Sequence, residues 1–172
     1  MPSIISMLKA QQRDWYDRNS GTGRMSEWML SAPNPGAAPD DIHAAETTLG
    51  LRFDDQYRQW LSHVNGWTAF SGGGDLYPLG DISKNSPEHR AMLDMFRESL
   101  IEPGDLEMDS FDNLVLIGGT PDGIQYVTVG SPEQRRTAAP VWEIEDIEYT
   151  RFGDLKEFLN REVVSRRGLM LG

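Results

Sequence analysis

The sequence predicts a single α+β domain in which about four to five α-helices pack with a mainly antiparallel β-sheet. Three features of the 172 residues carry this prediction. Apolar residues recur at helical spacing in the first half of the chain, short runs rich in β-branched and aromatic residues follow, and an amphipathic segment closes it. Helices followed by a strand meander and a closing helix are typical of α+β folds, whereas parallel α/β folds alternate the two kinds of element.

An amphipathic helix is expected to open the chain, with Ile4 and Leu8 on its apolar face. The stretch Pro33–Gly36 interrupts any helix, because proline lacks the amide hydrogen that a helix interior requires. We therefore expect an N-terminal helical extension, residues 1–32, packed on a main domain of residues 33–172.

Two further helices are expected after this linker. The first has Ile42 and Leu49 on one face, Asp40 or Asp41 as its amino-terminal cap, and Gly50 as its stop.

The second has a longer apolar face, formed at spacings i, i+4, i+7, i+8 and i+11 by Phe53, Tyr57, Trp60, Leu61 and Val64. Asp54 or Asp55 is expected to cap it, and Asn65-Gly66 to end it, because both of these last residues tolerate a left-handed backbone.

The rest of the chain reads mainly as short strands. Extended segments are expected at Phe70 and over residues 76–79. A third helix opens at Ser86-Pro87, has an apolar row of Met92, Phe96 and Leu100, and is closed by Pro103-Gly104. Strands are then expected over residues 114–117, 124–129 and 141–144. A final helix begins at Asp154, which caps it while Glu157 bonds back.

The charge and composition restrict the classes of ligand and the location that we expect for this protein. The formal net charge is −11 and the sequence pI is about 4.6, which disfavours nucleic acids and anionic membranes as ligands. The acidic surface either favours a basic partner or simply keeps the protein soluble, and charge alone favours the second explanation. No stretch approaches the roughly 20 apolar residues of a membrane span, and no basic region precedes an apolar run at the amino terminus. We expect a cytoplasmic protein.

Catalytic and cofactor chemistry finds no support in the residue pattern. Cysteine is absent, and the three histidines, His43, His63 and His89, have no metal-ligand spacing. Gly72-Gly73-Gly74 lacks the lysine that completes a phosphate-binding loop. We predict no catalytic residue, no cofactor and no metal site.

Acidic residues interleaved with aromatic ones suggest a protein-binding surface. Charge would steer a basic partner, and aromatic side chains would anchor it, although a solvated loop and an ordinary strand edge explain the acidic stretches equally well. The residues expected on the partner-binding face are Trp67, Asp75, Tyr77, Glu143 and Glu145, with Asp105, Glu107 and Asp109 as second choices.

Residues of the two central helices resemble the signature of the SUKH superfamily, the Smi/Knr-type domain. The matching pattern is Asp41-Ile42-x-x-x-Glu46-x-x-Leu49-Gly50, followed by Phe53-x-x-x-Tyr57-Arg58-x-Trp60-Leu61-x-x-x-Asn65-Gly66-Trp67. The resemblance extends over about residues 33–164, and the terminal part is carried by Phe152-x-x-Leu155-x-x-Phe158-Leu159. The chain departs from the family at Phe53-Asp54, where relatives usually have Leu-Pro, and in a longer insertion between Ile82 and Leu114.

The resemblance implies binding and no catalysis. Bacterial members of the superfamily resemble immunity proteins against polymorphic toxins, and eukaryotic members resemble regulatory scaffolds. The resulting hypothesis is a monomeric, non-enzymatic immunity protein for a cognate protein toxin, expected to be a basic nuclease or deaminase. An intracellular regulatory adaptor of the cell-wall-assembly-regulator type is the alternative.

Overall fold

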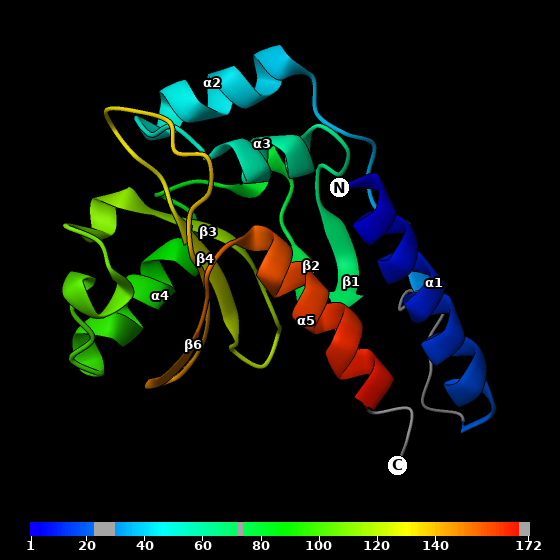
Figure 1. Cartoon of the computed structure of the whole chain (residues 1–172). Helices are drawn as coiled ribbons and strands as arrows, with labels where there is room; N and C mark the ends of the chain where they lie inside the picture. Colours follow the sequence, from blue (N-terminus) through cyan, green and yellow to red (C-terminus); the bar gives the residue numbers. More distant parts are fainter. Residues whose placement is uncertain (23–29, 72–73, 169–172) are drawn as a thin grey trace.

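A six-stranded antiparallel sheet forms the centre of the fold, with its strands in the order β1-β2-β3-β4-β5-β6 (Figure 1). The computed structural model describes residues 1–22, 30–71 and 74–168. The strands are β1 (Trp67–Ser71), β2 (Gly74–Leu76), β3 (Leu114–Gly119), β4 (Gln125–Val129), β5 (Val141–Glu145) and β6 (Glu148–Phe152). The helices are α1 (Pro2–Asn19), α2 (Pro39–Leu49), α3 (Asp55–Leu61), α4 (Pro87–Glu98) and α5 (Leu155–Gly168). The predicted α+β class is confirmed.

Helices cover both faces of the sheet, so the central strands are buried on both sides. Val115 and Ile117 of β3 pack into one core with residues of α1, α2, α3 and α5. Leu114 and Leu116 point the other way, into a second core with residues of α4. Figure 1 shows α1 and α5 side by side, with α4 across the sheet from them. The two-sided burial explains why β3 reads as a continuous apolar run.

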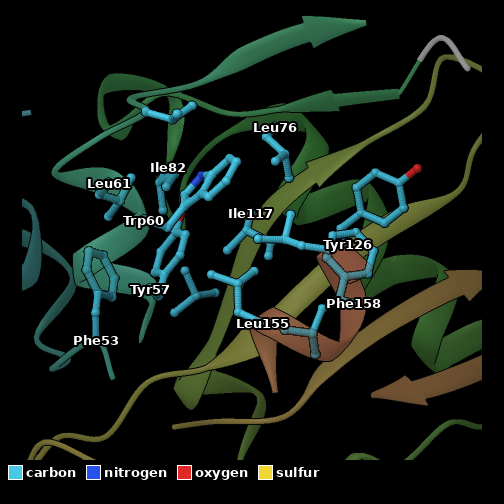
Figure 2. Packing of buried hydrophobic residues seen from close by; sticks show 14 of the residues in the cluster. Phe53, Tyr57, Trp60, Leu61, Leu76, Ile82, Ile117, Tyr126, Leu155 and Phe158 are labelled. Atoms are coloured by element: carbon cyan, nitrogen blue, oxygen red, sulfur yellow. The ribbon is translucent and has the colours of Figure 1, made fainter. Parts of the chain in front are cut away.

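The larger core contains aromatic side chains of the helix motif among many aliphatic ones. Trp60 lies beside Ile117, and Phe158 of α5 packs near Tyr126, their ring centroids 5.2 Å apart (Figure 2). Tyr57 is buried against Phe53 at a centroid distance of 5.2 Å in an edge-on arrangement. These buried residues hold the helices on the sheet, and their side chains offer no exposed surface for a partner.

The start of α2 differs from the prediction, while its end agrees. Ala38 occupies the cap position and Pro39 the first turn, so the expectation of an Asp40 or Asp41 cap is wrong. Pro39 begins the helix earlier because its fixed φ suits the first turn. The two aspartates then lie in that turn, where their negative charges interact favourably with the positive end of the helix dipole. Gly50 ends the helix with a φ of +68°, as predicted.

The caps at the starts of α3, α4 and α5 agree with the sequence, but the expected end of α3 at Asn65-Gly66 is wrong, because α3 stops at Leu61 and the chain turns at Ser62 and His63. One apolar row also differs. Ser86 Oγ accepts a hydrogen bond from the His89 amide at 3.1 Å, and Asp154 Oδ1 accepts one from the Glu157 amide at 2.8 Å. Helix α4 ends at Glu98, ahead of the predicted Pro103-Gly104 stop. Leu100, expected on the apolar face, is exposed with a φ of +56°, because the chain leaves the helix before reaching it.

The strand β6 is absent from the sequence prediction. Four of its five residues are exposed, and only Phe152 is buried. An edge strand of this kind is held by its hydrogen bonds to β5, so its sequence lacks the buried alternation that identifies a strand. Within the described residues, no helix has both the length and the apolar character needed to cross a membrane.

Candidate functional site

The turn that joins β5 to β6 carries the most exposed apolar side chains on the sheet. Ile147 is 63% exposed and Tyr149 is 44% exposed. Glu145 and Glu148 are direct cross-strand partners, and Asp146 lies in the turn between them; all three are exposed. We call residues 145–149 the hairpin surface.

The hairpin surface departs from several local stability preferences. Like charges opposite each other, as at Glu145 and Glu148, are destabilising in an antiparallel pair. Asp146 has a φ of +55°, which is uncommon for a residue other than glycine. Large apolar side chains such as Ile147 lose the stabilisation of burial when they face water. Departures of this kind concentrate at functional sites, where binding rather than folding determines the residue.

Of the residues predicted on the partner-binding face, Glu143 and Glu145 lie on this hairpin. They point to the same face of β5 because side chains two residues apart in a strand share a face. Glu145 is exposed at the turn. Glu143 lies 3.8 Å from Arg161 Nη1 of α5, and the Arg161 guanidinium stacks over Phe152 at 5.0 Å. Glu143 therefore contributes to holding α5 on the sheet.

The edge formed by β6 is open, in contrast to the opposite edge of the sheet. At β1, Gln12 of α1 donates to the Ala69 carbonyl at 3.0 Å, and Ser31 Oγ donates to the Thr68 carbonyl. In the part of the chain that the structure describes, no further strand pairs with β6. Alternate residues of an antiparallel strand direct their backbone groups away from the partner strand, so β6 offers backbone donors and acceptors to the outside.

The structure places the first group of predicted residues, Trp67, Asp75 and Tyr77, far from this hairpin at the β1 end of the sheet. Trp67 is fully buried and its Nε1 donates to the Ser31 carbonyl at 3.1 Å, so the expected exposure of this side chain is wrong. The helix and sheet layers close over it. Asp75 Oδ1 accepts from the Ala69 amide at 2.7 Å, which stabilises a residue with a φ of +52°. Tyr77 is half-buried and lines a cavity of about 340 Å³ at the start of α4.

The second-choice acids lie on the segment after α4, and one of them reaches β6. Arg151 of β6 makes two contacts with Glu107, Nε to Oε1 at 2.7 Å and Nη2 to Oε2 at 2.8 Å. Asp105 accepts a hydrogen bond from the Glu102 amide at 2.8 Å and so shapes a local turn. Asp109 is exposed and lines a separate cavity of about 340 Å³ beside α4.

A buried carboxylate surrounded by arginines is a feature that the sequence analysis missed. The side chain of Glu46 is completely buried, and its Oε1 accepts from the Phe53 amide at 2.9 Å. Its Oε2 lies 2.7 Å from Arg58 Nη1, 3.5 Å from Arg135 Nη2 and 3.7 Å from Arg52 Nη1. We call these three arginines the arginine cluster. Glu46 and Arg58 stand in the helix motif, but no local pattern indicates that Arg135 joins them.

The titratable groups near α3 are perturbed by burial. Burial raises the pKa of Asp54 to about 6, against the hydrogen bonds it accepts from the Tyr57 and Gln56 amides, which lower it. Burial also raises the pKa of Tyr57. Among the described residues, no three or more histidine, aspartate or glutamate side chains are grouped so as to hold a metal ion.

The comparison with known protein families agrees with the motif of the two central helices. The profile of the SMI1 / KNR4 family (SUKH-1) matches residues 36–161, which include α2 to α4 and all six strands. No curated protein shows a significant sequence match to the chain. Since the matched region is well over half of the 172 residues, the chain belongs to the SMI1 / KNR4 (SUKH-1) family.

Proposed function

We propose that this chain is a non-enzymatic immunity protein that binds a cognate bacterial toxin domain and neutralises it. The observation that carries the proposal is the hairpin surface, where exposed Ile147 and Tyr149 stand among exposed carboxylates at an open sheet edge. Binding is also the role that the resemblance to bacterial immunity proteins of the superfamily implies.

The chemistry of the hairpin surface favours a basic partner. Glu145, Asp146 and Glu148 would attract a positively charged protein face and increase the rate of encounter. Ile147 and Tyr149 would then bury apolar area at the centre of the contact and slow dissociation. A nuclease or deaminase toxin domain fits this description, because proteins that act on nucleic acids present basic surfaces to the phosphate backbone.

The proposal predicts a toxin gene beside the gene for this chain, and the test is association with the carboxyl-terminal domain of that toxin. Kinetics are measured for the wild type and for a Glu145→Lys/Glu148→Lys variant at about 50 mM and about 200 mM salt. We expect the variant to associate at least roughly tenfold more slowly at the lower salt, with a weaker salt dependence. Glu143 is left unchanged, because its reversal would also break the contact with Arg161.

A matched control separates the hairpin surface from net charge. The variant Asp14→Lys/Asp122→Lys reverses two exposed acids elsewhere and, like the hairpin variant, changes the net charge from −11 to −7, since each reversal adds two. Equal loss of association rate in both variants would assign steering to overall charge and remove the hairpin surface from the proposal. Failure of the wild type to bind the toxin or to protect cells that express it would contradict the immunity function and favour the regulatory adaptor.

A further inference from the structure

The arginine cluster has more positive charge than its single carboxylate balances. Arg52, Arg58 and Arg135 contribute three charges, and Glu46 contributes one of the opposite sign, which leaves an excess of two. This concentration of guanidinium groups stands out in a chain whose net charge is −11. Like charges held this close repel one another, and a further bound anion would reduce that repulsion.

The hydrogen-bonding capacity of the cluster is also unmatched. Only Oε2 of Glu46 faces the arginines, because Oε1 is used by the Phe53 amide. One carboxylate oxygen offers about two acceptor positions, whereas each guanidinium carries five N–H donors. Arg58 Nη1 forms the closest ion pair with this oxygen, at 2.7 Å, Arg135 Nη2 donates a hydrogen bond to it at 3.5 Å, and Arg52 Nη1 lies 3.7 Å away. Among the described residues, the other N–H groups of Arg52 and Arg135 have no carboxylate partner, so they are available to another acceptor.

The pair Arg151–Glu107 is an example, in the same molecule, of an arginine whose charge and donors are matched by one carboxylate. Both carboxylate oxygens of Glu107 are contacted by one guanidinium, at 2.7 and 2.8 Å. In such a bidentate pair, two N–H groups of the planar guanidinium each have a carboxylate oxygen as acceptor. The arginine cluster differs because three guanidinium groups converge on one oxygen.

Solvent reaches the two arginines with the longer contacts. The side chains of Arg52 and Arg135 are 43% and 39% exposed, and that of Arg58 is 22% exposed. Arg52 lies between α2 and α3, and Arg135 lies on the loop between β4 and β5. The backbone of Arg52 pairs with Ser131 at the start of that loop, at 2.7 and 3.1 Å, so the two segments are held together independently of the side chains.

The exposed acids on these segments do not restore the balance. Asp55 and Glu133 are both exposed, and within the residues that the structure describes neither forms an ion pair with the arginine cluster. The site is thus a preformed, partly exposed arrangement of cationic donors, anchored from beneath by a buried carboxylate.

We propose that the arginine cluster binds a small phosphate-type oxyanion between Arg52 and Arg135. A tetrahedral oxyanion carries more than one charge and several acceptor oxygens, which match both the excess charge and the available guanidinium donors. This binding is separate from the protein-binding hairpin, and it does not depend on the toxin-neutralising function.

The test uses inorganic phosphate and isothermal titration calorimetry at about pH 7, where phosphate carries between one and two charges. Potassium chloride holds the ionic strength constant. We expect the wild type to bind phosphate with a Kd on the order of 1 mM. The variant Arg52→Gln/Arg135→Gln should bind at least roughly tenfold more weakly, because it lacks both accessible guanidinium groups. Arg58 is retained so that Glu46 keeps its closest partner and the fold is preserved.

The matched control is Arg90→Gln/Arg97→Gln, which removes two exposed arginines of α4 and causes the same change in net charge. It should bind phosphate as the wild type does. Thermal unfolding supplies a second readout, in which phosphate should raise the Tm of the wild type and the control more than that of the cluster variant. Phosphate also stabilises folded proteins in general, but this effect is common to all three proteins and cancels when their Tm shifts are compared.

Three results would overturn the proposal. The wild type could show neither binding heat nor an additional rise in Tm, or the cluster variant could retain the wild-type affinity. Acetate could bind to the wild type as tightly as phosphate, which would exclude the assignment to a phosphate-type oxyanion. Weaker acetate binding, with phosphate binding lost only in the cluster variant, supports it.

Discussion

Two features of the Asp54 environment shift the pKa of its carboxyl group in opposite directions. Its Oδ1 caps α3, accepting from the amides of Gln56 at 2.9 Å and Tyr57 at 3.0 Å, which favours the carboxylate. The same side chain is buried, which disfavours the carboxylate, and burial prevails because the pKa rises to about 6. The sequence indicated the cap but could not indicate the burial, since the burial depends on how α3 packs.

At the residue scale, Asp54→Asn is expected to stabilise the protein at pH 7 and to make no difference near pH 4. The pKa of Asp54 in the folded state lies above its ordinary value of 3.8, so the folded protein holds this proton more tightly than the unfolded chain does. Ionised Asp54 therefore costs stability above about pH 6, and the cost disappears as the pH falls toward 3.8. Asparagine caps a helix about as well and carries no charge.

The measurement is the free energy of unfolding of both proteins in urea at several pH values from 4 to 7. The difference between variant and wild type should grow with pH to on the order of 2 kcal/mol. Because other acids titrate equally in both proteins, the difference isolates Asp54. A constant difference across this range would contradict a raised pKa.

At the scale of elements, the strands differ in how much their sequences reveal. The strands β3, β4 and β5 were predicted because their residues are β-branched or aromatic and buried. The strand β6 was missed because its exposed residues carry no such pattern, although it completes the hairpin that became the candidate interface. The hairpin acids Glu143 and Glu145 were predicted as interface residues, whereas Ile147 was not, because the residue type of an apolar side chain does not tell whether it is exposed.

The close approach of β2 to β3 gives a prediction at this scale. A Cβ atom at Gly118 would overlap the backbone carbonyl oxygen of Asp75 and crowd the ring of Tyr126. Gly118→Ala should therefore separate the two strands and lower the free energy of unfolding by about 1–3 kcal/mol. Thermal unfolding followed by circular dichroism measures the change. Gly80→Ala is the control, because nothing lies within 4 Å of the added atom, and its Tm should be nearly that of the wild type.

At the scale of the whole molecule, the segment before the family-matched region is part of the core. The family match begins at residue 36, yet Ile4 and Leu8 of α1 belong to the larger core, and Gln12 bonds to the edge of β1. Helix α1 thus buries apolar surface and closes one edge of the sheet. At the other edge, no strand among the described residues pairs with β6, and this asymmetry is one reason why we propose the hairpin surface as the binding site.

Leu8→Ala tests the structural role of α1. Leu8 is fully buried, so truncation should leave a cavity and lower the free energy of unfolding by about 2–4 kcal/mol. Met7→Ala, on the 37% exposed neighbour, should change it by less than about 1 kcal/mol. Urea unfolding measures both. Equal effects of the two substitutions would mean that α1 does not pack as the structure shows.

The sequence by itself determined the family, the α+β class, most helix starts and the acidic character. Each of these depends on residue types and on spacings within a few turns of chain, which periodicity and capping chemistry express directly. The tertiary structure alone decided that Trp67 is buried, that β6 forms an open edge, and that Glu46 gathers three arginines. Those features depend on contacts across long sequence separations, such as the 89 positions that separate Arg135 from Glu46, and packing rather than local pattern selects such partners.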